Sequence, residues 1–155
     1  MRTYINYWGK KLTFPEELLY TPELLWVKIE PDETLRIGIS DLGVKAVKEL
    51  LYVRIKSRAG NQLKKGDLIG TVETSKMVWQ IIAPVSGVVV AVNDKLLAGN
   101  PAVIEHDPYG EGWILQLQKT SETTRELSQL MPGSDEKTKQ WIAERIEATI
   151  PLQMT

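Results

Sequence analysis

Short runs of alternating apolar and polar residues recur along the first three quarters of the chain. In residues 35–39 and 51–55 every second residue is aliphatic, which is typical of strands with one buried face. Further β-prone runs, each bounded by turn-forming residues, cover 68–74, 77–82, 88–92 and 113–118. Strands this short and this evenly punctuated predict a small β sandwich or barrel.

A longer spacing of apolar residues predicts helices in two places. Residues 41–50 carry an apolar side chain at every fourth position behind a Ser-Asp cap at 40–41, which indicates a short amphipathic helix. Two helices are predicted to close the chain, separated by a bend at Pro132 and Gly133, the second with Ser134 as its N-cap. Their apolar faces comprise Leu127, Leu130 and Met131 in the first and Ile142, Ile146 and Ile150 in the second.

Composition narrows the class of protein. The 155 residues, 43% of them hydrophobic, suffice for one core without metals or disulfides. Because the chain has no cysteine, any redox chemistry must come from an added group. Nineteen basic and twenty acidic residues leave no overall field for nucleic acid, and no apolar run is long enough for a membrane span or a signal peptide. We expect a cytoplasmic monomer that binds neither nucleic acid nor membrane.

Two local features are candidates for recognition or metal binding. Residues 50–66 contain five basic residues and no acid, which indicates either a solvated face or a docking patch for an acidic partner. These five are Arg54, Lys56, Arg58, Lys64 and Lys65. His106 is the only histidine, and without a second ligand nearby it predicts a surface position rather than a metal site.

Lys76 lies between the two most sharply bounded strand runs, ten residues after Gly66 and eleven before Gly87. If these runs pair, the turn falls at about residues 74–77 and lifts Lys76 into water. In an arbitrary hairpin, such a residue would be an ordinary surface lysine. A Schiff-base or general-base lysine needs a desolvated pocket, which an exposed turn does not offer.

Two sequence blocks around Lys76 stand at a fixed spacing, V-E-T-S-K at 72–76 and A-P-V-S-G at 83–87. Together they resemble the lipoyl-lysine hairpin of the glycine cleavage system H-protein family. The similarity continues in one register through R-I-G-I-S-D at 36–41, L-K-K-G-D at 63–67, V-A-V-N at 90–93, N-P at 100–101 and D-P-Y-G-E-G-W at 107–113.

The resemblance implies a mainly β fold, the hammerhead-like barrel-sandwich hybrid of lipoyl domains, with C-terminal α-helices packed against it. It divides the chain into an N-terminal arm (1–19), a lipoyl-carrier β domain (20–120) and C-terminal helices (121–155). Gly66 and Gly87 would permit the bends that bring the two halves together. The strand pattern and the resemblance therefore predict the same architecture.

The resemblance further implies that Lys76 carries covalent lipoate and that the chain is a carrier without a catalytic site of its own. Lipoate supplies the disulfide that a cysteine-free protein lacks, and the tether keeps an aminomethyl intermediate at high effective concentration. The implied partners are a lipoylating enzyme and the P, T and L proteins: glycine decarboxylase, aminomethyltransferase and dihydrolipoyl dehydrogenase. Trp79, three residues from the lysine, would shield the arm. The lipoylating enzyme would read Glu73, Thr74 and Ser75 through the shape of the turn, and these residues form with Met77 the hairpin around the lysine.

The chain departs from the family pattern at the positions that hold the arm. Where the family has a histidine and a glutamate before the first strand, this chain has Leu24 and Leu25, and Gln80 replaces a later acid. Without these carboxylates, a cationic aminomethyl group loses its charge-assisted hydrogen bonds. Glu23 is a substitute that lies one residue out of register. These departures leave open a second role, an H-like lipoate-binding protein that carries sulfur intermediates for heterodisulfide-reductase-like enzymes.

Two further hypotheses concern the modification of Lys76. Biotinyl domains share this general fold and have methionine on both sides of the modified lysine, whereas here Met77 follows it but Ser75 precedes it. An unmodified scaffold would tolerate the substitution Lys76→Arg without loss of function.

Overall fold

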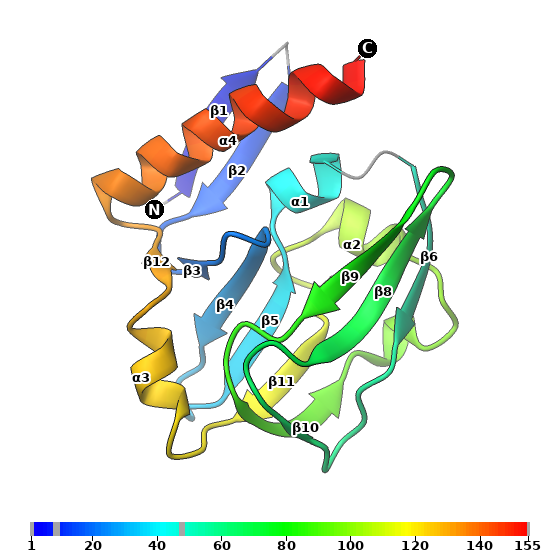
Figure 1. The fold of residues 1–155 in the computed structure, drawn as a ribbon, viewed down its shortest axis with the longest axis vertical. Helices are drawn as coiled ribbons and strands as arrows, with labels where there is room; N and C mark the ends of the chain where they lie inside the picture. Colours follow the sequence, from blue (N-terminus) through cyan, green and yellow to red (C-terminus); the bar gives the residue numbers. More distant parts are fainter. Residues whose placement is uncertain (1, 8–9, 47–48, 155) are drawn as a thin grey trace.

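The computed structural model describes residues 2–7, 10–46 and 49–154. Figure 1 shows two β-sheets packed against each other, an N-terminal hairpin that stands apart from them, and a long C-terminal helix across the top. The strands of the hairpin are β1 (Arg2–Tyr7) and β2 (Lys10–Pro15). The helices are α1 (Asp41–Ala46), a 3₁₀ turn (Asp94–Leu96), α2 (Ala102–His106), α3 (Thr123–Leu127) and α4 (Glu136–Met154). None of the described helices is long and apolar enough to cross a membrane.

The two sheets are antiparallel throughout. The larger has the order β12-β3-β4-β5-β11-β10-β7, and the smaller has the order β6-β8-β9. The larger sheet contains β3 (Leu19–Tyr20), β4 (Leu25–Ile29), β5 (Leu35–Ile39), β7 (Gln62–Leu63), β10 (Gly87–Val92), β11 (Leu115–Gln118) and β12 (Met131–Pro132). The smaller contains β6 (Leu50–Ile55), β8 (Leu68–Thr74) and β9 (Val78–Ile82). This is the sandwich that the alternating pattern predicted.

The main core lies between the two sheets. Val53, Val72 and Ile81 come from the three strands of the smaller sheet, and all are fully buried. Ile37 and Leu117 of the larger sheet are equally buried in the same cluster. Each such side chain contributes about 1.5–3 kcal/mol through removal from water. The period of two therefore places one face of each strand inward, as expected.

A second core joins the N-terminal hairpin to the helices. Leu12 of β2, Leu42 of α1 and Ile142 and Ile146 of α4 are buried together with Trp26. Figure 1 shows α4 crossing the hairpin and passing above α1, and the apolar face predicted for this helix is confirmed at these two isoleucines. Ile150 was expected on the same face, but its side chain lies outside the described residues.

In the segment predicted as a helix over 41–50, the structure describes a helix over Asp41–Ala46, and Leu50 already belongs to β6. A bulge between Leu50 and Tyr52 breaks the strand's register. Leu50 therefore points into the core, and Leu51 is 58% exposed, although the alternation placed Leu51 inward. A single inserted residue reverses the facing of its neighbours, and apolar patterning alone does not reveal it.

The predicted bend at Pro132 and Gly133 is also different in the structure. Met131 and Pro132 form β12, which pairs with β3, so Met131 does not continue a helical face. Gly133 donates its N–H to the Leu18 carbonyl at 2.8 Å. A Cβ at Gly133 would lie 2.8 Å from the Pro15 carbonyl oxygen, so the glycine is needed for close backbone approach.

Candidate functional site: the Lys76 hairpin and its groove

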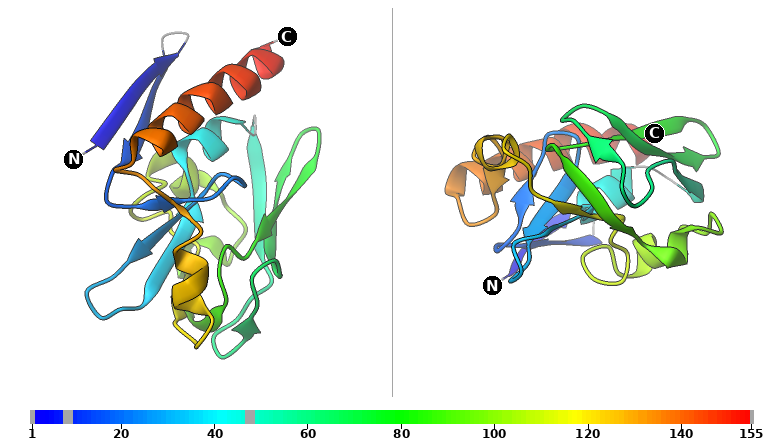
Figure 2. Two further views of the ribbon diagram at one scale, coloured as in Figure 1. Left: turned by 60° about the vertical axis from the view of Figure 1, so that its left-hand side comes forward. Right: turned by 90° about the horizontal axis from the view of Figure 1, so that it is seen from below.

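Lys76 lies in the turn between β8 and β9. The register pairs Glu73 with Val78 and Val72 with Trp79, and the Thr74 N–H donates to the Met77 carbonyl at 2.9 Å. Ser75 and Lys76 therefore form the tip of the hairpin. In the left view of Figure 2 this turn, drawn in green, projects at the edge of the molecule. The turn predicted at residues 74–77 is confirmed.

The side chain of Thr74 holds this turn together. Its hydroxyl oxygen accepts the N–H groups of Lys76 at 3.2 Å and Met77 at 3.1 Å. The same hydroxyl can donate to the Met77 carbonyl at 3.1 Å. A threonine side chain thus satisfies backbone groups that the tight turn leaves without ladder partners.

The residues at the tip are open to solvent. Ser75, Lys76 and Met77 are exposed, and Glu73 and Thr74 are half-buried in β8. Among the described residues, the Lys76 amino group makes no hydrogen bond or ion pair. The lysine side chain is therefore accessible from solvent, and its backbone is held by hydrogen bonds.

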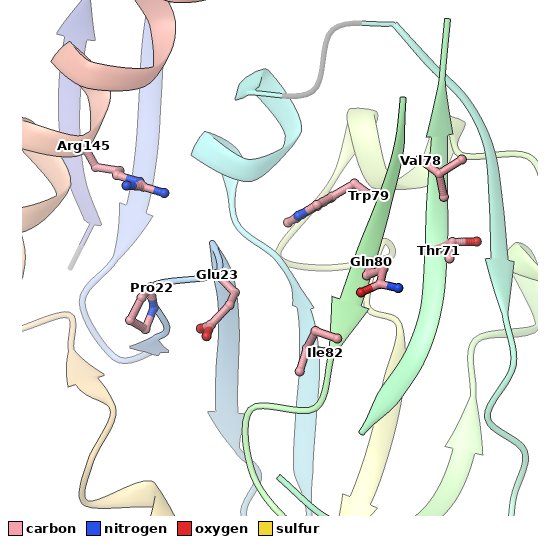
Figure 3. Close-up of a pocket in the computed structure, with 8 residues that line it drawn as sticks. All are labelled: Pro22, Glu23, Thr71, Val78, Trp79, Gln80, Ile82 and Arg145. Atoms are coloured by element: carbon pink, nitrogen blue, oxygen red, sulfur yellow. The ribbon is translucent and has the colours of Figure 1, made fainter. Parts of the chain in front are cut away.

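A groove of about 630 Å³ runs along β9, beside the hairpin. Figure 3 shows Trp79 pointing from β9 toward the groove, with Glu23 and Arg145 across from it on other elements. The groove is lined by Pro22, Glu23, Thr71, Val78, Trp79, Gln80, Ile82 and Arg145. A second hollow of about 230 Å³ shares Pro22, Glu23 and Ile82 and extends toward Lys65. The two hollows therefore adjoin each other at these three residues.

The groove contains residues at which the chain departs from the family pattern. Leu25 is buried in β4, and Leu24 is half-buried with a φ of 69°. Glu23, one residue earlier, is exposed and lines the groove with Gln80. A carboxylate is therefore present there despite the shift in register.

Arg145 was not foreseen from the sequence. It follows Glu144 in α4 and precedes the buried Ile146, so helical periodicity places it at the border of the buried face. Its guanidinium carbon lies 6.0 Å from the centroid of the Trp141 ring. Only the packing of α4 against α1 and the hairpin brings this cation to the groove.

The A-P-V-S-G block forms a braced turn at the base of the hairpin. The buried Glu126 carboxylate accepts the Ser86 N–H at 2.7 Å and the Ser86 hydroxyl at 3.0 Å. Thr123 donates to the Ser86 carbonyl at 2.7 Å. Gly66 has a φ of +96°, and a Cβ at Gly87 would lie 2.9 Å from the Gln118 carbonyl oxygen. Gly66 therefore permits a turn with positive φ, and Gly87 permits the close approach of two backbone segments.

The basic stretch does not form one patch. Lys64 pairs with Glu122 at 3.3 Å, and Lys65 donates to Gln129 at 2.9 Å. Arg54 and Lys56 are exposed elsewhere, on and just after β6. All five basic residues are exposed, Arg58 included, and the stretch divides into Lys64 and Lys65, which contact side chains of later segments, and a group on and after β6.

His106 is exposed and ends α2. Within the described part of the chain, no three histidine, aspartate or glutamate side chains gather closely enough to hold a metal ion. No role for His106 follows from its position.

A β sandwich that presents one lysine at an exposed hairpin tip is the architecture of a swinging-arm carrier. The family model for glycine cleavage H-protein matches residues 18–144. The H protein of Mycobacterium avium (strain 104) is 42% identical over 104 residues, which cover 67% of this chain and 77% of that protein. The glycine cleavage system H protein 3 of Aquifex aeolicus is 38% identical over 122 residues, 77% of this chain and 74% of its own length.

The crystal structure of the H protein from Mycobacterium marinum matches with a TM-score of 0.64 and 34% identity. The matched region covers 75% of this chain and 97% of the Mycobacterium marinum chain. The chain belongs to the glycine cleavage H-protein family, and the predicted barrel-sandwich fold is confirmed. The hairpin of β1 and β2 precedes the segment matched by the family model, and Arg145 lies one residue beyond it.

Proposed function

We propose that this chain is a lipoyl carrier of the glycine cleavage type and that Lys76 is the attachment residue. The supporting observation is the exposed lysine at the tip of a turn whose backbone is held by Thr74. The proposal makes the chain a carrier on which partner enzymes act, with no catalytic site of its own.

The residues around Lys76 fit a long acyl arm. The lysine side chain is exposed, and the neighbouring groove has an indole wall at Trp79 and polar groups at Glu23, Gln80 and Arg145. Such a mixed lining suits an aliphatic chain that ends in a polar or charged cargo. Trp79 is half-buried beside the groove, which supports its proposed role in shielding the arm. When bound, lipoate supplies a dithiolane that accepts an aminomethyl group and electrons.

Attachment requires the Lys76 amine as a nucleophile. Its Nζ bonds to the activated carboxyl carbon of lipoate, an amide forms, the activating group leaves, and the nitrogen loses a proton. Glu73, Thr74, Ser75 and Met77 shape the turn that the lipoylating enzyme reads.

The glycine cleavage role is favoured over the sulfur-carrier and biotinyl hypotheses by the family and by the relatives that share it. Glu23 adds a physical reason, because its carboxylate is available to a cationic aminomethyl group in the groove. The partners proposed are the P, T and L proteins of that system. The compartment proposed is the cytoplasm.

The first test is intact mass spectrometry of the protein from its host, with peptide mapping across residue 76. We expect a lipoyl adduct on Lys76, no adduct in Lys76→Arg, and a full adduct in the control Lys137→Arg, which changes an exposed lysine on α4 and keeps the hairpin lysine. An unmodified Lys76 in cells whose other lipoyl proteins are loaded would refute the carrier role. An adduct with the mass of a biotinyl group would show that the attached cofactor is biotin and not lipoate.

The second test reconstitutes the lipoylated protein with glycine decarboxylase and aminomethyltransferase. We expect glycine-dependent release of CO₂ that requires the adduct on Lys76. Lipoylated protein that supports no glycine decarboxylation with these enzymes would exclude the glycine cleavage role and leave the attachment site intact.

A further inference from the structure

The smaller sheet has a covered side and an open side. Val53, Val72 and Ile81 face the core and are fully buried. Because neighbours across antiparallel strands share a face, the pairing of Tyr52 with Glu73 and of Glu73 with Val78 places these three on the opposite side. All three lack full burial. Figure 3 shows Val78 and Thr71 pointing one way from the sheet and Trp79 the other.

The end of this open face nearest Lys76 is unusually apolar. Seven large hydrophobic side chains among the described residues are exposed. Four of them lie at this end of the smaller sheet: Leu51 at 58%, Tyr52 at 37%, Met77 at 54% and Val78 at 58%. Leu51 owes its exposure to the bulge in β6. Exposed apolar clusters that adjoin a functional group mark interaction sites.

Basic side chains border these apolar residues. Arg54 pairs with Thr71 across the open face, and its guanidinium carbon lies 5.5 Å from the centroid of the Tyr52 ring. Lys56 follows and is exposed. Within the described residues, neither Arg54 nor Lys56 forms an ion pair with a carboxylate. The half-buried Glu73 is the one acid in the paired and described part of the open face, so the cations are available to a partner.

We propose that Leu51, Tyr52, Arg54, Lys56, Met77 and Val78, the hairpin docking face, bind the lipoylating enzyme, and that this enzyme carries carboxylates around its active-site entrance. The proposal rests on the carrier function proposed above and adds the surface and charge of the first partner. Aromatic residues, methionine and arginine are the types enriched at interface centres. Unpaired cations at the border select an acidic partner.

The size of the face suits a transient encounter. Six side chains are far fewer than the roughly 20–30 residues that each partner contributes to a stable interface. A modifying enzyme must leave after one acyl transfer, so a small apolar centre with charged edges is adequate. The docking contacts are the same before and during acyl transfer. They therefore affect the KM for this protein and leave kcat unchanged.

The test measures lipoylation of the unmodified full-length protein by the host's lipoylating enzyme with activated lipoate. The charge-reversal variant is Arg54→Glu with Lys56→Glu, and its control is Arg125→Glu with Lys137→Glu, two exposed cations on α3 and α4. Reversal of both docking cations should raise KM about tenfold with kcat unchanged. The control pair should stay within about twofold of the wild type.

Two further measurements complete the experiment: one uses substitutions of exposed apolar residues, and the other varies the salt concentration. Val78→Ser should raise KM several-fold, whereas Val90→Ser, which changes an exposed valine on β10, should not. Raising the salt from about 0.01 to 0.15 M shortens the Debye length from about 30 to 8 Å. This change should raise the wild-type KM and lower that of the charge-reversal variant, because salt screens both the attraction of the cations and the repulsion of the introduced carboxylates.

The outcomes separate the two proposals. Lipoylated wild type combined with an unchanged KM in Arg54→Glu/Lys56→Glu would overturn the docking face and leave the carrier function standing. A lower KM in the charge-reversal variant would mean a basic enzyme entrance and would also overturn it. A wild type that the enzyme does not lipoylate would refute the carrier function itself.

Discussion

Thr74 provides the sharpest link between a single side chain and the presentation of Lys76. The substitution Thr74→Val keeps the shape and removes the hydroxyl that accepts two N–H groups and can donate to one carbonyl. These hydrogen bonds are exposed, so the freed backbone groups find water and the net loss is about 1 kcal/mol rather than the sum for buried bonds.

The consequence is a looser turn in a folded protein. A loss of about 1 kcal/mol lowers the population of the native turn by at most about fivefold, and lipoylation efficiency falls by the same factor if the enzyme reads that turn. The control Thr74→Ser keeps the hydroxyl and should retain most of the efficiency. The core residues Val72 and Ile81 are untouched, so the thermal midpoint should change by only a few degrees.

Two assays run side by side. Hydrogen exchange reports the protection of the Lys76 and Met77 amides, and kcat/KM for lipoyl transfer reports the competent turn. Faster exchange at both amides in Thr74→Val with wild-type transfer would refute the reasoning, since the enzyme would then be indifferent to the turn. Unchanged exchange would show that the hydroxyl does not hold the turn.

Two further predictions concern stability. Glu126→Ala should destabilise the protein by about 2–4 kcal/mol, because the buried Ser86 N–H loses a charged acceptor. The control Glu122→Ala removes a surface ion pair worth about 1 kcal/mol or less. Urea unfolding measures the free energy of unfolding of both variants. The hydroxyl and N–H of Thr34 lower the pKa of Asp32, so Asp32 stabilises the fold above its unfolded pKa of about 3.9 and the benefit is lost as pH falls through the lower folded value. The stability difference between wild type and Asp32→Asn should therefore be present at neutral pH and vanish in acid; a difference that grows in acid would contradict this.

Local signals were sufficient for much of the architecture. The bounds of β5 agree with an alternating run and those of β8 with a β-prone run bounded by turn residues, and the turn that carries Lys76 lies between β8 and β9 as predicted. These elements are short and bounded by turn residues, so side-chain period and turn chemistry decide their structure without distant contacts. Lys76 is exposed for the same local reason, because a residue at a two-residue hairpin tip lies beyond the sheet and cannot pack against the core.

Long-range packing decided what the pattern could not. The bulge that exposes Leu51 depends on pairing between β6 and β8. Met131 belongs to a strand because it pairs with β3 at the edge of the larger sheet. Arg145 and Glu23 come from segments more than 120 residues apart and line one groove only because α4 packs over α1. The amino-acid order therefore specifies the strands and the lysine they present, whereas the neighbours of that lysine depend on which surfaces the folded chain buries against one another.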